Sequence, residues 1–385
     1  PNPNAYTAAS TDLYILRNFV NHLDATISDP YIYRNAGCTP VDAVIVWQDS
    51  DDLLTSVDLS PDGTYISFTV DRLTIRQGNA IVAVRDAAQR IMWSWHIWVT
   101  DYELGSDDKE VTNYSGHKFT AMPIDIGWSE YLSATYPARN AMVRITQTET
   151  GRTRTFTLNQ LAATIISYGN NTYYQWGSKD PILPGVINQS KVISDKVYYP
   201  GEYEFDKTTN GPVSFGTSIQ TPYIYYKQAS SGFLNWSLEN YNNLWSAESN
   251  TTSTFVYNTG VKTIYDPSPV GFMVSPIGAW SGFTSTGTSS STPSQFNVKG
   301  TFNYGWNFYC LPGKKGDTLF FPVTGYRLVG NGTAAYLGDS GAYWASTASE
   351  LTGGYAQSIS SGTVNVSRLT RSAAVPVRPV REVRE

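Results

Sequence analysis

WSWHIWVTD, residues 93–101, places three of the chain's 11 tryptophans and one of its three histidines within nine positions. Side chains alternate between the two faces of a β-strand. A strand of this sequence therefore has one apolar face, made of Trp93, Trp95, Ile97 and Val99. His96 and Trp98 lie on the opposite face, where we interpret them as a stacked or hydrogen-bonded surface pair. The pattern predicts a core strand of a β-sandwich. The sequence indicates no Ser, Asp or Cys partner with which His96 would form a catalytic triad.

The preceding residues continue this pattern. β-Branched and aromatic residues form short runs that are separated by turn sequences, SPDG and QGN. The expected strands cover 41–49, 64–70, 80–86 and 91–99. A turn signal about every ten residues, without a helical stretch between, predicts an antiparallel β-sandwich.

An acidic segment without periodicity, residues 101–116, is the expected linker. We interpret its acids, Asp107, Asp108 and Glu110, as hydrated. A chain of 385 residues is too long for one ordinary core, so two domains are expected, 1–104 and 105–385.

The second domain is expected to be α+β and rich in loops. Apolar residues at helical spacing predict two short helices, over 155–169 and over 237–249, the latter with Ser237 as N-cap. Strands are expected again near the C-terminus, over 318–328, 342–347, 355–360, 363–369 and 374–380. The long irregular stretches between these elements are where a ligand is expected, because such loops are often functional.

Composition narrows the class of protein. Aromatic residues make up 14% of the chain, charged residues only 15%, and the net charge is -5, which argues against nucleic acid as a partner. No run approaches the roughly 20 apolar residues that span a bilayer. Sparse charge with many Tyr, Trp, Asn and Thr residues is typical of exported bacterial surface proteins. We interpret four late arginines as an outward strand face or a loose tail: Arg371, Arg378, Arg381 and Arg384.

Several motifs resemble a known family. GNAIVAVRDAAQRIMWSWHIWVTD (78–101) resembles the closing hairpin of a β-domain in fimbrillin-type pilins and related surface lipoproteins of Bacteroides-like bacteria. The later part is similar to a C-type-lectin-like, Fibrobacter-paralogue-type domain that often follows it. The matching stretches are YYQWGSKDP (173–181), YDPSPVGFMV (265–274), FPVTGYR (321–327), GAYWAST (341–347) and AVPVRPVRE (374–382).

The resemblance implies a transthyretin-like β-sandwich followed by a loop-rich lectin-like domain. It implies a non-catalytic adhesin-like subunit, tip or minor pilin, of a fimbria at the cell surface, anchored through the outer membrane. Its partners would be other pilin subunits, joined by strand addition, and a glycan or protein receptor. The alternative is a free-standing carbohydrate-binding surface lipoprotein. No cofactor is expected. Enzymatic activity is not expected either, because the cysteines of the related formylglycine-generating enzymes are absent.

Acidic clusters offer two further readings. Asp49, Asp51 and Asp52 suggest a calcium site, but the loop lacks the glycine and the glutamate of an EF-hand, so we favour a solvated turn. Glu202, Glu204 and Asp206 suggest paired carboxylates for sugar hydrolysis, but acids at alternating positions are also common on strand edges.

The remaining candidate residues concern metals and ligands. No Cys/His cluster has metal-ligand spacing, and Cys38 and Cys310 are interpreted as incidental thiols rather than a disulfide. For sugar binding we expect exposed rings with a polar neighbour, and we name Trp306, Tyr336 and Asp339. Trp176 and Trp344 are expected to be buried.

Overall fold

The computed structural model describes residues 16–130, 132–167, 170–188, 190–228, 235–247, 249, 260–349 and 352–382. Strands account for 42% and helices for 6%, and the strands form several antiparallel sheets. The predicted β-rich fold class is therefore confirmed. The finer assignments to a transthyretin-like sandwich and a C-type-lectin-like domain stay predictions.

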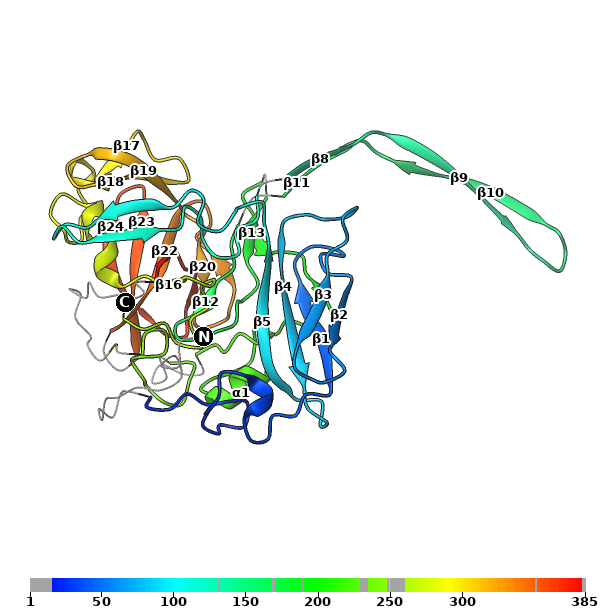
Figure 1. Cartoon of the computed structure of the whole chain (residues 1–385). Coiled ribbons are helices and arrows are strands. Elements are labelled where there is room, and N and C mark those ends of the chain that lie inside the picture. Colours follow the sequence, from blue (N-terminus) through cyan, green and yellow to red (C-terminus); the bar gives the residue numbers. More distant parts are fainter. Residues whose placement is uncertain are drawn as a thin grey trace.

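The stretch WSWHIWVTD lies in a four-stranded antiparallel sheet, called here the first sheet (Figure 1). Its strands, in spatial order, are β15 (Tyr199–Pro200), β1 (Asp42–Gln48), β4 (Gly78–Arg85) and β5 (Ile91–Val99). A separate hairpin of β2 (Ser56–Leu59) and β3 (Ile66–Thr69) turns at 60–63. The four strands predicted from the sequence are thus present.

Both faces of the first sheet are covered. The face that carries Val82 and Trp95 packs against Leu53, Leu54 and the β2–β3 hairpin. The opposite face packs against side chains from later in the chain, which are Leu183, Tyr198, Tyr203, Phe205 and Tyr223. The alternation predicted for β5 holds, but the face with His96 also packs against other segments, so that His96 and Trp98 are half-buried.

The rest of the chain forms small antiparallel sheets. One contains β12 (Tyr174–Gln175), β25 (Ala374–Val375), β20 (Tyr326–Arg327) and β21 (Ala334–Ala335). Another contains β16 (Phe272–Val274), β26 (Pro379–Arg381), β7 (Lys118–Ala121) and β6 (Lys109–Thr112). Two three-stranded sheets are β17 (Val298–Lys299), β18 (Gly305–Leu311), β19 (Lys315–Pro322) and β22 (Ser340–Ser349), β23 (Gly353–Ser360), β24 (Val364–Thr370). β13 (Gly185–Ile187) pairs with β14 (Ile193–Asp195). The 3-10 helices among the described residues are η2 (Ile32–Arg34), η3 (Ile277–Phe283) and η4 (Pro293–Gln295).

The two halves share their largest core. One cluster of buried hydrophobic side chains contains Phe19 and Trp93 together with Trp176 and Trp344. The segment expected to be a linker contains β6, and its Asp108 accepts hydrogen bonds from Arg381 and Tyr102 instead of being hydrated. The boundary at residue 104 stays a prediction, and residues from both sides of it pack together.

Both predicted helices are wrong. Residues 155–169 contribute to two strands, and the described part of 237–249 is irregular, with Asn243 buried. The amide of Asn243 donates to the carbonyl oxygens of Leu16 and Ala247, and such side-chain bonds to the backbone compete with a helix. The one α-helix described, α1 (Phe215–Gln220), begins where the hydroxyl of Ser214 accepts from the Thr217 N–H.

The prediction of an outward or loose arginine tail is also wrong for the described arginines. Arg371 and Arg378 are fully buried, and their guanidinium groups lie over the rings of Trp176 and Phe321 at 4.2 and 4.3 Å. Their N–H groups are used by backbone carbonyls and by polar side chains of distant segments. Arg381 is half exposed, and Arg384 lies outside the described residues.

A long two-stranded ribbon projects from the body, and we call it the arm, residues 132–167 (Figure 1). Its inner part pairs β8 (Leu132–Tyr136) with β11 (Ala163–Ser167), and its outer part pairs β9 (Arg139–Thr146) with β10 (Thr153–Gln160). Residues 148–151 form the turn at its tip.

Candidate functional site

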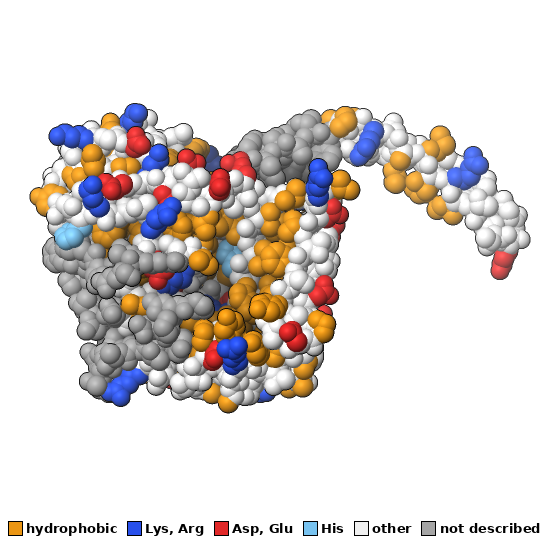
Figure 2. Space-filling model, in the orientation of Figure 1, with side chains coloured by type: hydrophobic (Ala, Val, Ile, Leu, Met, Phe, Trp, Pro, Cys, Tyr) orange, Lys and Arg blue, Asp and Glu red, His pale blue; other side chains and the backbone are white. Residues whose placement is uncertain are grey.

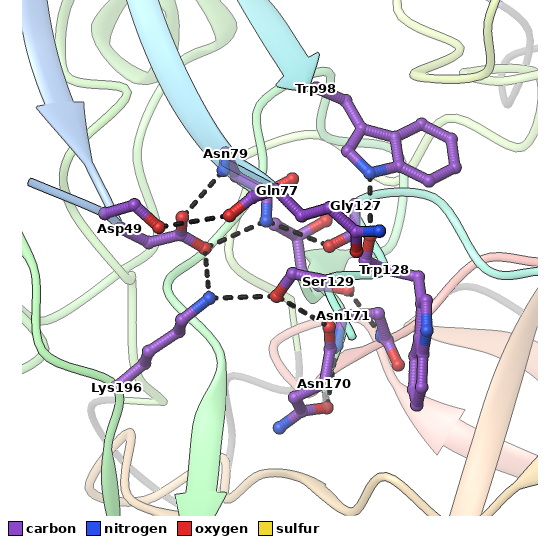
Figure 3. Close-up of polar contacts among 12 residues, drawn as sticks. Asp49, Gln77, Asn79, Trp98, Gly127, Trp128, Ser129, Asn170, Asn171 and Lys196 are labelled. Carbon is purple, nitrogen blue, oxygen red and sulfur yellow. Dashed lines mark hydrogen bonds and ion pairs between the residues drawn. The ribbon is translucent and has the colours of Figure 1, made fainter. Parts of the chain in front are cut away.

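The arm leaves the body at a pair of backbone hydrogen bonds between Ser129 and Asn170. The Ser129 N–H donates to the Asn170 carbonyl oxygen at 2.8 Å, and the Asn170 N–H donates back at 3.0 Å. Lys196 Nζ donates to Ser129 Oγ at 2.9 Å and to Asp49 Oδ2 at 3.0 Å (Figure 3). We call these residues, together with Asn79, the root of the arm.

Asn79 connects the root to the first sheet. It is fully buried, and its backbone N–H donates to Asp49 Oδ1 at 2.7 Å. Its Nδ2 donates to Asp49 Oδ2 and to the carbonyl oxygen of Gly127, both at 2.9 Å (Figure 3). The carboxylate of Asp49 is therefore buried and accepts three hydrogen bonds, contrary to the predicted solvated turn, while Asp51 and Asp52 are exposed.

His96 extends the same network on the next strand. Its Nε2 lies 2.9 Å from Asn79 Oδ1, and its Nδ1 lies 3.0 Å from the hydroxyl of Tyr174. Because an amide oxygen only accepts, Nε2 carries the proton and Nδ1 accepts from Tyr174. Burial lowers the pKa of His96 to about 3, so the ring is neutral at physiological pH. Both nitrogens are engaged, and the histidine holds position rather than transferring protons.

Two further contacts fix the segment just before the arm to the strand β5 and to the residue that precedes β4. The Nε1 of Trp98 donates to the Trp128 carbonyl oxygen at 2.8 Å, and Gln77 Oε1 accepts from the Glu130 N–H at 2.7 Å. Trp98, like His96, is thus half-buried, and each is hydrogen-bonded to a later segment of the chain rather than to the other. The root holds the base of the arm through buried polar contacts, which are costly to break individually.

The outer arm is amphipathic. Cross-strand pairs Ala141–Leu158 and Val143–Phe156 lie on one face, and the alternate pairs are mostly polar. This apolar face of the arm consists of Ala141, Val143, Ile145, Phe156 and Leu158. Ile145, Phe156 and Leu158 are 59%, 45% and 55% exposed, and Figure 2 shows hydrophobic side chains along the projecting arm. This exposed apolar surface makes the outer arm the candidate contact site.

The three residues predicted to bind a ligand do not form one exposed group. Trp306 is buried, contrary to expectation, because it packs edge-on against Phe296 and Phe302 and donates Nε1 to the Ser360 carbonyl oxygen. Tyr336 and Asp339 are exposed in one turn, where the Asp339 N–H donates to the Tyr336 carbonyl oxygen. The ring of Tyr336 stacks on Tyr326 at 5.1 Å. Trp176 and Trp344 are buried, as predicted.

Two of the other predicted acids, Glu202 and Asp206, have structural partners, and Glu204 is exposed. Glu202 lies 3.9 Å from Arg85, and Asp206 accepts from the hydroxyl and N–H groups of the turn that follows it. Cys38 and Cys310 are free, buried and in different core clusters, which agrees with the interpretation as incidental thiols. In the part of the chain that the structure describes, no three His, Cys, Asp or Glu side chains are grouped as metal ligands.

The arm is the feature that sequence reasoning missed. The spacing of Leu158, Leu161 and Ile165 was compatible with a helix, but Phe156 and Leu158 also alternate with threonines as in a strand. A second run with period two, RNAMVRIT at 139–146, precedes a TETG turn. Two alternating runs around a turn are the signal of a hairpin.

No family model, curated protein or solved structure matches this chain. Within the described residues, no helix is long and apolar enough to cross a membrane.

Proposed function

We propose that this protein is a non-catalytic subunit of a bacterial surface fibre, in which the arm joins subunits. One observation carries the proposal: a firmly rooted hairpin projects from the body with its apolar face exposed. An isolated two-stranded ribbon is marginally stable in water. Burying its apolar face against a neighbour removes that surface from water and stabilises the ribbon.

Strand pairing is a second support. β9 and β10 pair only with each other among the described strands, so each has an outer edge that offers backbone N–H and C=O groups. β5 likewise pairs only with β4. Such edges suit assembly by strand addition, in which main-chain hydrogen bonds supply the affinity. The resemblance of residues 78–101 to fimbrillin-type pilins points the same way and suggests a tip or minor subunit, anchored at the outer membrane.

The test places a photo-crosslinking amino acid at Leu158 in cells that display the protein. We expect high-mass crosslinked species, because Leu158 lies on the apolar face of the arm. The matched control is the neighbouring position, Thr157, which lies on the opposite face. Absence of any crosslinked protein from Leu158 would contradict an assembly role for the arm.

A carbohydrate-binding role is the second candidate. It is supported by the exposed ring of Tyr336 beside the exposed carboxylate of Asp339, since sugars bind by ring stacking and polar contacts. A glycan array with the full chain tests it, and Tyr336→Ala should abolish binding. Binding that survives Tyr336→Ala would exclude this turn as the sugar site.

A further inference from the structure

We propose that the apolar face of the arm binds the β2–β3 hairpin of a second copy of this chain. The receiving surface, which we call the acidic hairpin, comprises residues 51–71. The inference rests on the proposed assembly role and names the partner surface. Four features carry it: charge, exposed apolar side chains, free strand edges and the direction of the arm.

The outer arm is basic in an acidic protein. Residues 139–160 contain four arginines and one acid, Glu149, which gives a net charge of +3. The whole chain has a net charge of -5, so the remainder carries -8. Two of the arginines, Arg139 and Arg154, lie on the same side of the ribbon as the apolar face. Arg139 pairs across the ribbon with Gln160, and Arg154 pairs with Ile145. The apolar face is therefore flanked by positive charge.

The acidic hairpin has the complementary character. Its 21 residues include no Lys or Arg and five aspartates, Asp51, Asp52, Asp58, Asp62 and Asp71. Tyr65 and Phe68 are 71% and 42% exposed, so apolar surface lies among these carboxylates. β3 pairs only with β2 among the described strands, which leaves an edge to which an arm strand can add.

The contact is made between copies. Figure 1 shows β9 and β10 extending beyond the body, while the root fixes the base of the arm. Because the arm and the acidic hairpin are different surfaces, each copy can bind one contact through its arm and another through its acidic hairpin. Such an interface closes as a dimer if two copies exchange arms, and it generates a larger ring or an open fibre if each arm binds the next copy in turn.

The size of the arm sets the strength of one contact. Eight residue pairs at about 3.4 Å each, two strands wide, give a face of roughly 27 by 10 Å. That is about 270 Å², well below the roughly 800 Å² per partner of a stable complex. We therefore expect a single arm contact to be weak and sensitive to salt, and to become stable when strand pairing or repetition adds to it.

The experiment measures self-association of the full chain by sedimentation velocity at low salt. Arg139→Glu/Arg154→Glu changes the arm, and Asp51→Arg/Asp58→Arg changes the acidic hairpin. We expect each variant alone to associate at least tenfold more weakly than the original chain. Mixing the two should restore association, because each mixed contact again joins opposite charges. Arg144→Glu, on the opposite face of the ribbon, is the matched control for Arg154→Glu alone, and it should weaken association much less.

Two results overturn the inference. One is a chain that sediments as a monomer at every concentration; the other is a variant mixture that associates no better than its components. Crosslinking from Leu158 to a different protein would also overturn it, while leaving the proposed assembly role intact. Failure of both the sedimentation and the crosslinking experiments removes the assembly role itself.

Discussion

Arg378 Nε donates a hydrogen bond of 2.5 Å to Asp125 Oδ1, across 253 positions of the chain. Both side chains are at most 1% exposed. Arg378 also donates Nη1 to the Pro123 carbonyl oxygen at 3.0 Å. This ion pair ties the end of the described chain to the segment just before the arm.

Replacing Arg378 by Ala should strongly destabilise the fold. The change leaves the carboxylate of Asp125 buried without its partner, which costs about 3–5 kcal/mol in the free energy of unfolding. Urea unfolding measures this value. Arg381→Ala is the control, because half-exposed Arg381 pairs with Asp108 in a position where a pair contributes about 0–1 kcal/mol. Equal decreases in the free energy of unfolding for both variants would show that burial of the Arg378–Asp125 ion pair does not increase its contribution to stability.

His96 should make the fold acid-sensitive. A histidine in the unfolded chain has a pKa near 6.5, whereas burial lowers the pKa of His96 to about 3. Between these values the unfolded chain binds a proton that the native chain does not, so the free energy of unfolding falls as pH falls. This residue contributes a slope of at most about 1.4 kcal/mol per pH unit.

His96→Gln should flatten this pH dependence below pH 6.5, as measured by denaturant unfolding between pH 4.5 and 7.5. His117→Gln, at an exposed histidine, serves as the control and should keep the original slope. Burial also lowers the pKa of His22, so part of the acid sensitivity should remain in the His96 variant. An unchanged slope in His96→Gln would refute the role given to this ring.

Gly127 should tolerate no side chain. Its φ is +76°, and an added Cβ would lie 2.3 Å from Thr172 Oγ1 and 2.8 Å from Asn79 Oδ1. Gly127→Ala should therefore cost more than the roughly 1–2 kcal/mol of a left-handed alanine. Gly116→Ala is a matched control, since φ is +87° there and nothing lies within 4 Å of the added atom. Thermal unfolding of the two variants should separate the clash in the root from the backbone cost.

Removing the outer arm should leave the body folded. Residues 139–160 are almost all exposed, so replacing 137–162 by a short glycine-serine turn removes little buried surface. We expect the unfolding temperature to change by only a few degrees, while self-association is lost. A body that unfolds without the arm would instead make the arm part of the core.

Local patterns predicted the strands well, because alternation is a property of neighbouring residues. β1, β4 and β5 all follow runs of β-branched and aromatic residues. The sequence of the arm is ambiguous, because Leu158, Leu161 and Ile165 fit a helical spacing while Phe156 and Leu158 fit an extended one. In the structure, pairing with β9 and β8 decides between them.

The errors about burial have a different origin. Nothing near His96 in the sequence indicates that Tyr174 covers it, and nothing near Arg378 reveals Asp125. Trp306 was expected to be exposed, but Phe296 and Phe302 enclose it. A charged or polar residue in a polar stretch is predicted to be exposed, because its local sequence does not indicate which distant segment supplies its partner.

The separation of Asp125 and Arg378 also has a consequence for biosynthesis. At about 5–20 residues per second, Asp125 leaves the ribosome some 13–50 s before the arginine that neutralises it. β7 likewise lacks its neighbour β26 until the end of the chain has been synthesised, since Ala121 pairs with Val380. During this interval the nascent chain holds an open sheet edge and an uncompensated carboxylate, and an unpaired edge of this kind favours aggregation.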